Sequence, residues 1–264
     1  MTIICTVGDS ITMLRRNLLH IVRYPGLTMF VIGAPVVFLM LFVFVFGGTL
    51  GAGLPGVDSD GGRAAYLPYV MPGILAMTIA GTAGGTATTV AMDMTEGITA
   101  RFRTMAISRA AVLAGHVLGN TVQAVLGVTV VLVVGIAVGF RPNADLPQWI
   151  SAGLLVVLIA FAISWVAVAM GMASKSVETA SNLPMLLLLL PFLGSGFVPT
   201  DTMPTGLRWF ADYQPFTPFV ETLRGLMAGT PVGSNLALAL AWCAVITVVG
   251  YVWSMSIYEK KSVR

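Results

Sequence analysis

Charged side chains are scarce in this 264-residue sequence: Asp, Glu, Lys and Arg make up 9% of it, against 57% for hydrophobic residues. An ordinary globular protein carries about 25% charged residues. A domain of this length cannot bury so much apolar surface away from water, because surface-to-volume scaling fixes the buried fraction. The composition therefore excludes a soluble domain, a disordered chain and a nucleic-acid-binding protein, and it leaves lipid as the solvent for the apolar side chains.

Cysteine and lysine are also rare, and each shortage excludes a class of chemistry. Cys5 precedes the first apolar stretch and Cys243 lies in the last one, so we expect two reduced thiols packed like small hydrophobic residues rather than a disulfide scaffold. The only lysines are Lys175, Lys260 and Lys261, and none follows a glycine. The phosphate-cradling motif G-x-x-x-x-G-K-[ST] is therefore missing, and this chain is not expected to hydrolyse ATP through a P-loop.

Patterns of catalytic and metal-binding residues are missing too. Gly8-Asp9-Ser10 matches the nucleophile block of one esterase family, but neither His20 nor His116 has the Asp three positions earlier that the family's pattern requires. Because nucleophilic catalysis needs a histidine base held near the serine, we interpret Ser10 as a helix cap. Neither H-E-x-x-H nor C-x-x-C occurs. We therefore expect no catalytic residue, no metal site and no cofactor bound by this chain.

Six apolar stretches are long enough, or nearly so, to cross a bilayer as helices, which takes about 20 residues each. The fifth has only 16 residues and contains Pro191. No Asp, Glu, Lys or Arg falls in the middle of any stretch, which is not the pattern of a proton- or sodium-driven carrier. The expected spans are 27–46, 69–92, 111–140, 150–173, 183–198 and 236–258.

Six spans place both termini on one side of the membrane, and the basic residues predict which side that is. Ten basic residues fall on the side of the termini and four on the other, so the termini are expected in the cytoplasm. The first stretch follows a long basic leader without an A-x-A site, which favours a retained signal anchor. Eleven arginines against three lysines, with abundant Ala, Val and Gly, hint at a GC-rich bacterial genome and hence a bacterial inner membrane.

Residues 9–24 have the apolar spacing of an amphipathic helix, which would lie in the inner membrane interface. Pro25 and Gly26 would end this helix before the first span. The alternative is a basic leader that only orients the chain in the membrane. The basic residues of the expected interface helix are Arg15, Arg16, His20 and Arg23.

Residues 93–109 form the main cytoplasmic loop and mix both charge signs with apolar residues such as Phe102. A loop that only returns the chain does not need apolar residues. The pattern therefore favours a short helix that docks against another protein, and a simple solvated turn is the alternative.

The segment 199–231, after the fifth span, is neither polar nor continuously apolar. We expect two short helices over 204–212 and 218–228, with Thr217 as the N-cap of the second and Gly229 as its C-terminal stop. Such helices would dip into the outer leaflet and complete the short fifth crossing. The expected fold class is an all-α integral membrane protein: six transmembrane helices, an N-terminal amphipathic interface helix, and short re-entrant helices between spans five and six.

Polar side chains in or near the spans are few, and each group has two interpretations. Glu221 and Arg224 are spaced i, i+3 and would pair either as a polar outer gate or as an ordinary exposed helical pair. Hydroxyls and amides in spans two and three would either hydrogen-bond between helices or line a translocation path. These residues are Thr78, Thr82, Thr86, Asn120 and Gln123.

Five stretches carry a resemblance to a known family. They are 16–25 (RNLLHIVRYP), 69–75 (YVMPGIL), 96–103 (EGITARFR), 197–204 (FVPTDTMP) and 215–227 (PFTPFVETLRGLM). With the order of parts, they make the chain similar, over nearly its whole length, to the type-2 ATP-binding-cassette permeases. It most resembles the daunorubicin-resistance type of drug and lipid exporter subunit.

The resemblance implies a single transmembrane domain over 1–264 and a dimer made of two copies or two different permeases. It also implies a separate cytoplasmic ATPase subunit bound to each half, which would carry ATP and Mg²⁺. The segment 93–109 would then include the coupling helix. The coupling residues would be Asp93, Glu96, Gly97, Arg101, Phe102 and Arg103.

The expected function is that of a permease subunit of an ATP-binding-cassette exporter. It would move a hydrophobic drug, lipid or glycolipid out of the cytoplasm or the inner leaflet, driven by the ATPase subunit. The missing nucleotide motif and the uncharged membrane interior agree with work supplied by a partner. Two alternatives stay open: a non-transporting membrane anchor or regulatory subunit, and an energy-independent channel or facilitator.

Overall fold

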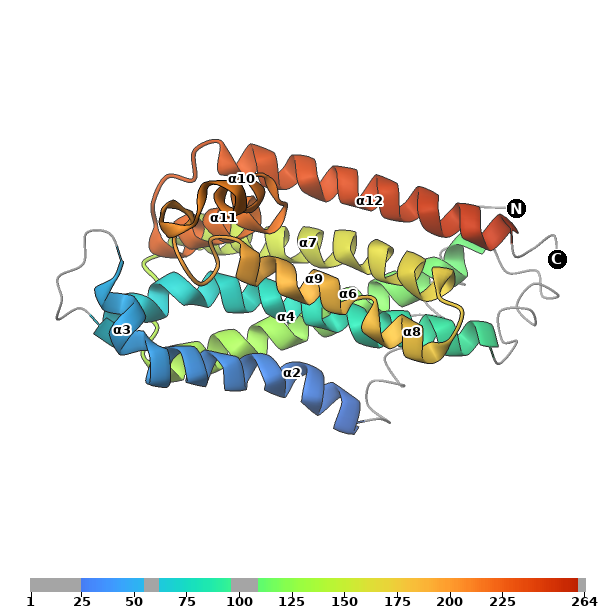
Figure 1. Ribbon diagram of the computed structural model, residues 1–264, viewed down its shortest axis with the longest axis horizontal. Helices are drawn as coiled ribbons and strands as arrows, with labels where there is room; N and C mark the ends of the chain where they lie inside the picture. Colours follow the sequence, from blue (N-terminus) through green and yellow to red (C-terminus); the bar gives the residue numbers. More distant parts are fainter. Residues whose placement is uncertain (1–24, 55–61, 96–108, 261–264) are drawn as a thin grey trace.

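The computed structural model describes residues 25–54, 62–95 and 109–260, and within these ranges the chain is helical without any strand (Figure 1). The expected interface helix lies outside the described residues, so the structure does not report on Arg15, Arg16, His20 or Arg23. The same holds for the middle of the expected coupling segment, which contains Glu96, Gly97, Arg101, Phe102 and Arg103.

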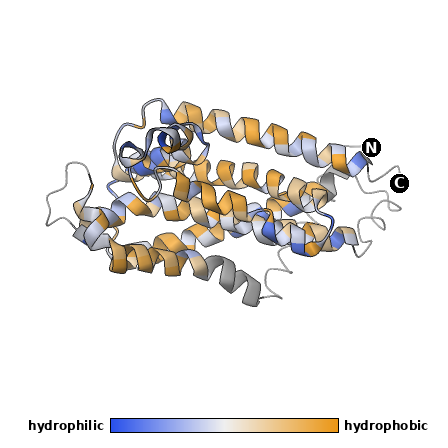
Figure 2. Cartoon of the chain, viewed as in Figure 1, coloured by the Kyte–Doolittle hydropathy of each residue, from blue (hydrophilic) through white to orange (hydrophobic). Residues whose placement is uncertain are grey.

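Five stretches of helix in the described residues are long and apolar enough to cross a membrane. Figure 2 shows apolar residues along most of their length. The first stretch is composite: α2 (Pro25–Met40) continues through the π-helical turns of η1 (Leu41–Phe46) into α3 (Gly47–Ala52). The other four are α4 (Gly62–Thr95), α6 (Arg109–Val138), α7 (Leu146–Ala173) and α12 (Asn235–Lys260). They match the expected spans one, two, three, four and six, with α4 beginning seven residues before its expected start at 69.

The expected fifth span, 183–198, is not one continuous helix. It follows α8 (Val177–Asn182) and contains α9 (Met185–Leu189) and the short 3₁₀ turn η2 (Leu190–Leu193). Pro184 and Pro191 interrupt the helical hydrogen bonds because proline has no N–H to donate. The part of the chain that the structure describes therefore has five candidate membrane-crossing helices and one shorter apolar helical run over Val177–Leu193.

Helix α4 forms the centre of the bundle, and 72% of its most apolar window is buried. It packs against α2, α6, α7, α8 and α11, whereas α12 packs mainly on α7 and α11 at the periphery. Only 17% of the α12 window is buried, so most of its apolar surface faces outward, as lipid exposure requires. Helix α4 is also richer in Gly and Thr than α12, and small residues let neighbouring helices approach closely.

The loop that follows η2 lies directly against α4. A Cβ atom placed on Gly73 would lie 2.3 Å from the carbonyl oxygen of Gly196, which is shorter than any real contact. Only glycine at this position lets the helix and the loop approach so closely. This contact brings the start of α4 next to residues that are more than a hundred positions later in the sequence.

The segment after this loop contains the two short helices that the sequence predicts. A 3₁₀ turn, η3 (Thr200–Thr202), precedes α10 (Thr205–Tyr213) and α11 (Phe216–Ala228), and both helices lie at the same end of the bundle as α3 (Figure 1). Gly229 ends α11 with a φ of +73°, as predicted.

The predicted N-cap of α11 is wrong. Thr217 lies inside the helix, which begins at Phe216, and its hydroxyl donates a hydrogen bond of 2.5 Å to the carbonyl of Ala211 in α10. A threonine near a helix start satisfies the local signal for a cap. Here the close approach of α10 supplies a different acceptor.

Candidate functional site

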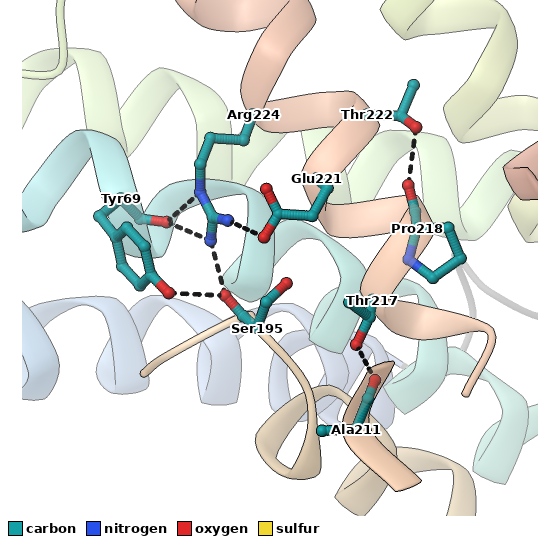
Figure 3. Close-up of polar contacts among 8 residues, drawn as sticks. All are labelled: Tyr69, Ser195, Ala211, Thr217, Pro218, Glu221, Thr222 and Arg224. Atoms are coloured by element: carbon teal, nitrogen blue, oxygen red, sulfur yellow. Dashed lines mark hydrogen bonds and ion pairs between the residues drawn. The ribbon is translucent and has the colours of Figure 1, made fainter. Parts of the chain in front are cut away.

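Arg224 of α11 is the centre of a polar cluster that joins three separate parts of the chain (Figure 3). Its Nη1 contacts Oε1 of Glu221 at 2.5 Å, on the same helix. Its Nε and Nη2 donate to the carbonyl of Tyr69 in α4, at 3.3 and 3.1 Å, and Nη2 also donates to the carbonyl of Ser195 at 2.7 Å. One guanidinium therefore ties α11 to α4 and to the loop after η2.

The side chain of Tyr69 also belongs to this cluster. Its ring lies 4.0 Å below the Arg224 guanidinium carbon, within the range of a cation–π interaction. Its hydroxyl donates to the Ser195 carbonyl at 3.1 Å, and the hydroxyl of Tyr66, one turn earlier, donates to the carbonyl of Phe197 at 3.0 Å. Two tyrosines and one arginine thus hold the main-chain carbonyls of the loop after η2.

The spacing of Glu221 and Arg224 correctly predicted their pairing, but the environment differs from that of an exposed helical pair. The Arg224 side chain is only 18% exposed, because α4 and the 195–197 loop cover it. Hydrogen bonds from a charged donor are stronger than neutral ones, and more so where water is partly excluded. A gating role of the pair stays a prediction, whereas its structural role in joining the segments follows directly from the geometry.

A cavity of about 600 Å³ lies beside this cluster, between α4, α11, the end of α3 and the turn after α6. Arg224, Glu221 and Tyr69 form part of its wall, and Arg141 and Asp201 also line it. The Oγ atom of Ser195, another lining residue, is buried and has no hydrogen-bond partner among the described residues. No sequence pattern indicated this cavity, because its lining comes from segments that are far apart in the chain.

A second polar contact lies at the opposite end of the bundle, where α4 ends and α6 begins. Asp93, in the last turn of α4, has its Oδ2 atom 3.2 Å from Nε2 of His116 on α6, and both side chains are at least 90% buried. Asp93 is the only residue of the expected coupling set that falls within the described ranges. His116 entered the sequence analysis only as a candidate base, and its pairing with Asp93 could not be predicted from spacing.

The three threonines of the expected polar face of α4 are buried. Thr78 is 0% exposed and donates to the carbonyl of Ile74 at 2.7 Å, and Thr82 donates to that of Ile79 at 2.8 Å. Thr86 is also buried. The hydroxyls of Thr78 and Thr82 therefore find their hydrogen-bond acceptors on their own helix, a common arrangement in membrane helices.

The amides of α6 are buried as well. Asn120 donates through Nδ2 to Oγ of Ser164 on α7 at 2.8 Å, and Ser164 in turn donates to the carbonyl of Ala160 at 2.6 Å. Gln123 lies one turn further along and is 8% exposed. Asn120 thus makes a hydrogen bond between helices, and a role for these residues in a translocation path stays a prediction.

Five long apolar helices in the described part of the chain, with α4 largely buried at their centre, define a multi-pass α-helical membrane protein. Comparison with known families makes the assignment specific: the model of the ABC-2 type transporter family matches residues 10–228. The chain therefore belongs to the ABC-2 type transporter family, and it is a membrane subunit of an ABC exporter.

Relatives match this chain over most of their own length. The daunorubicin resistance ABC transporter permease protein DrrB1 of Streptomyces coeruleorubidus is 27% identical over 257 residues, which cover 97% of this chain and 88% of the relative. The probable doxorubicin resistance ABC transporter permease protein DrrC of Mycobacterium tuberculosis is 27% identical over 226 residues, or 83% of this chain and 78% of that protein. The expected resemblance to a drug-resistance type of permease is thereby confirmed.

Proposed function

We propose that this chain exports a hydrophobic drug, lipid or glycolipid, and that a separate cytoplasmic ATPase subunit, which binds ATP and Mg²⁺, drives it. The observation that carries the proposal is the family assignment over residues 10–228, together with relatives named for resistance to daunorubicin and doxorubicin. Two permease subunits, identical or different, would form the transporting unit. The absence of a P-loop in the sequence supports the division of labour between membrane and ATPase chains.

The end of the bundle that contains Asp93 would face the cytoplasm and receive the ATPase. The expected coupling segment, 93–109, leaves α4 and enters α6 at this end, and the pair of Asp93 and His116 joins the two helices at its base. A movement of this segment would therefore be transmitted to α4, the most buried of the long helices described. Both chain termini would lie on the same side, in the cytoplasm of a bacterial cell with the protein in its inner membrane.

The opposite end would face outward. There the run Val177–Leu193 would serve as a short fifth crossing, and α10 and α11 would be re-entrant helices that complete it in the outer leaflet. Trp209 and Tyr213 of α10 are 67% and 66% exposed, which suits a helix at the membrane interface. The Glu221–Arg224 pair would then belong to an outer gate.

The test is ATP-dependent transport in vesicles that contain the permease and its co-purified ATPase. Glu96→Ala and Arg103→Ala should reduce ATP-dependent export while leaving the yield and thermal stability of the complex unchanged. Arg208→Ala, an exposed arginine at the opposite end, is the matched control and should transport like wild type. Full ATP-dependent export after replacement of 96–103 by a Gly/Ser linker would overturn the proposed coupling. Equal export without ATP would instead indicate a facilitator.

A further inference from the structure

The cavity beside Arg224 is amphiphilic. Of its sixteen lining residues, eight are apolar, and these include Leu54, Phe140 and Met227. The other eight are polar or charged. A volume of about 600 Å³ falls in the range of pockets that hold small organic ligands, and it is far larger than a single small anion requires. The lining therefore suits a molecule with one polar and one apolar part.

The charges of the lining leave one cation without a counter-ion. Glu221 pairs with Arg224, and Asp201 pairs with Arg208 at 2.6 Å, so each acidic residue of the lining already has a basic partner. Arg141 makes no ion pair with any described residue. The formal charges of the lining sum to zero, and Arg141 is the point of the wall where a positive charge has no carboxylate partner among the described residues.

Some N–H groups of the Arg141 guanidinium make no hydrogen bond with the described residues. The guanidinium uses only Nη1, which donates to the carbonyls of Ile136 at 3.0 Å and Phe140 at 3.3 Å and so caps the end of α6. Its Nε and Nη2 groups make no hydrogen bond within the described residues. These two groups form the fork that binds phosphate or carboxylate oxygens in a bidentate way.

A second group in the lining also lacks a partner. The Oγ atom of Ser195 is buried, and an unsatisfied buried hydroxyl costs free energy unless something supplies its hydrogen bond. Its main-chain carbonyl is fully used by Tyr69 and Arg224, so the hydroxyl is the part of Ser195 left for a ligand. The positive charge and the unpaired hydroxyl both indicate an oxygen-rich anionic headgroup.

We propose that this cavity binds an anionic phospholipid of the adjoining leaflet, with its phosphate on the Arg141 guanidinium and its acyl-bearing end against Leu54, Phe140 and Met227. The Ser195 hydroxyl donates to an oxygen of the headgroup. Because Arg224 and Tyr69 form part of the wall, a bound lipid supports the cluster that holds α11 on α4. The proposal rests on the cavity and on membrane embedding, and it does not depend on the ATPase.

The experiment is calorimetric titration of the purified permease in a neutral detergent with dihexanoyl-phosphatidylglycerol, below its micelle concentration. Dihexanoyl-phosphatidylcholine has the same chains without net charge, and inorganic phosphate supplies the anion alone. Arg141→Gln should weaken binding of the anionic lipid about tenfold, as expected for one charge-assisted contact. Lys175→Gln removes an exposed positive charge outside the lining and should bind like wild type.

A second pair of variants tests the volume of the site without touching a charge. Ala65 lines the cavity and Ala64, its exposed neighbour on α4, does not. Ala65→Trp should block binding, and Ala64→Trp should leave it unchanged. The proposal would be overturned if the permease bound the choline lipid or inorganic phosphate as tightly as it binds dihexanoyl-phosphatidylglycerol. It would also be overturned if Arg141→Gln and Ala65→Trp both bound the anionic lipid like wild type. Because the titration uses neither ATP nor a partner, its result is independent of the proposed export function.

Discussion

Replacing Arg224 by Gln tests whether the guanidinium joins α11 to the rest of the bundle. The change removes the ion pair with Glu221 and the hydrogen bonds to the carbonyls of Tyr69 and Ser195. It also removes the positive charge over the Tyr69 ring. The side chain of Gln is polar, but it is shorter and its single NH2 group cannot reach both carbonyls.

The loss in free energy of unfolding can be estimated from the contacts that Arg224→Gln removes. A hydrogen bond from a charged donor contributes about 1.5–3 kcal/mol, so two carbonyl acceptors give about 3 kcal/mol at the lower bound. The Arg224 side chain is 18% exposed, and water will partly replace the lost donors, which reduces the expected loss to about 2 kcal/mol. For a chain of this size each ~1 kcal/mol shifts the unfolding midpoint by about 2–4 °C, so we expect a drop of about 4–8 °C.

The buried thiol of Cys243 provides the assay. It is 5% exposed, so a thiol-reactive dye will label it only as the bundle unfolds. In a Cys5→Ser background Cys243 is the sole cysteine. Heating the detergent-solubilised protein with the dye then reports the midpoint for each variant.

Arg208→Gln is the control, because Arg208 is 49% exposed and its ion pairs with Asp201 and Asp212 lie on the surface. Exposed pairs contribute at most about 1 kcal/mol, so its midpoint should fall clearly less than that of Arg224→Gln. Equal midpoints for the two variants would refute the idea that Arg224 joins the segments. The unfolding midpoint of Glu221→Gln should lie between those of Arg224→Gln and Arg208→Gln, since this change removes the counter-charge and keeps both carbonyl contacts.

Three further changes test other contacts. Gly73→Ala should sharply lower expression and the unfolding midpoint, since its methyl group would lie 2.3 Å from a loop carbonyl oxygen. Gly84 has open space around it, so Gly84→Ala should be neutral or stabilising by up to about 1 kcal/mol. Equal behaviour of the two variants would contradict the close packing at Gly73. Asn120→Ala and Ser164→Ala should show a coupling of about 0.6–1.7 kcal/mol in a double-mutant cycle, and strict additivity would mean that the hydrogen bond contributes nothing. His116→Leu should lower ATP-dependent export relative to ATP hydrolysis, measured in vesicles, because it unlinks the helices that flank the coupling segment; an unchanged ratio would count against that role.

Local patterns predicted the helices well where composition alone decides them. The long apolar runs became α4, α6, α7 and α12 within a few residues at most ends, because backbone in lipid must satisfy its hydrogen bonds internally. Gly229 ended α11 as predicted, since a left-handed residue at a helix end is a local requirement. The N-cap prediction failed at Thr217, because α11 begins one residue earlier, at Phe216, and the Thr217 hydroxyl donates to Ala211 of α10.

The candidate sites were predicted only in part. The i, i+3 spacing of Glu221 and Arg224 is a local relation, and their pairing followed from it. The carbonyls of Tyr69 and Ser195 that share the same guanidinium are 155 and 29 positions away from Arg224, and no periodicity connects them. The burial of Asp93 against His116 likewise depends on how α4 and α6 are packed.

The sequence by itself determined that this chain enters a membrane and where most of its crossings lie, and it showed that the P-loop motif is missing, because these follow from side-chain chemistry summed over short windows. Only the tertiary structure decided that α4 is the buried centre, that the fifth apolar run is broken, and that an arginine, two tyrosines and a loop converge beside a half-apolar cavity. The reason is physical: lipid solvates every apolar helix alike, so hydropathy cannot rank them. Close packing and the partners of a few polar groups determine the arrangement.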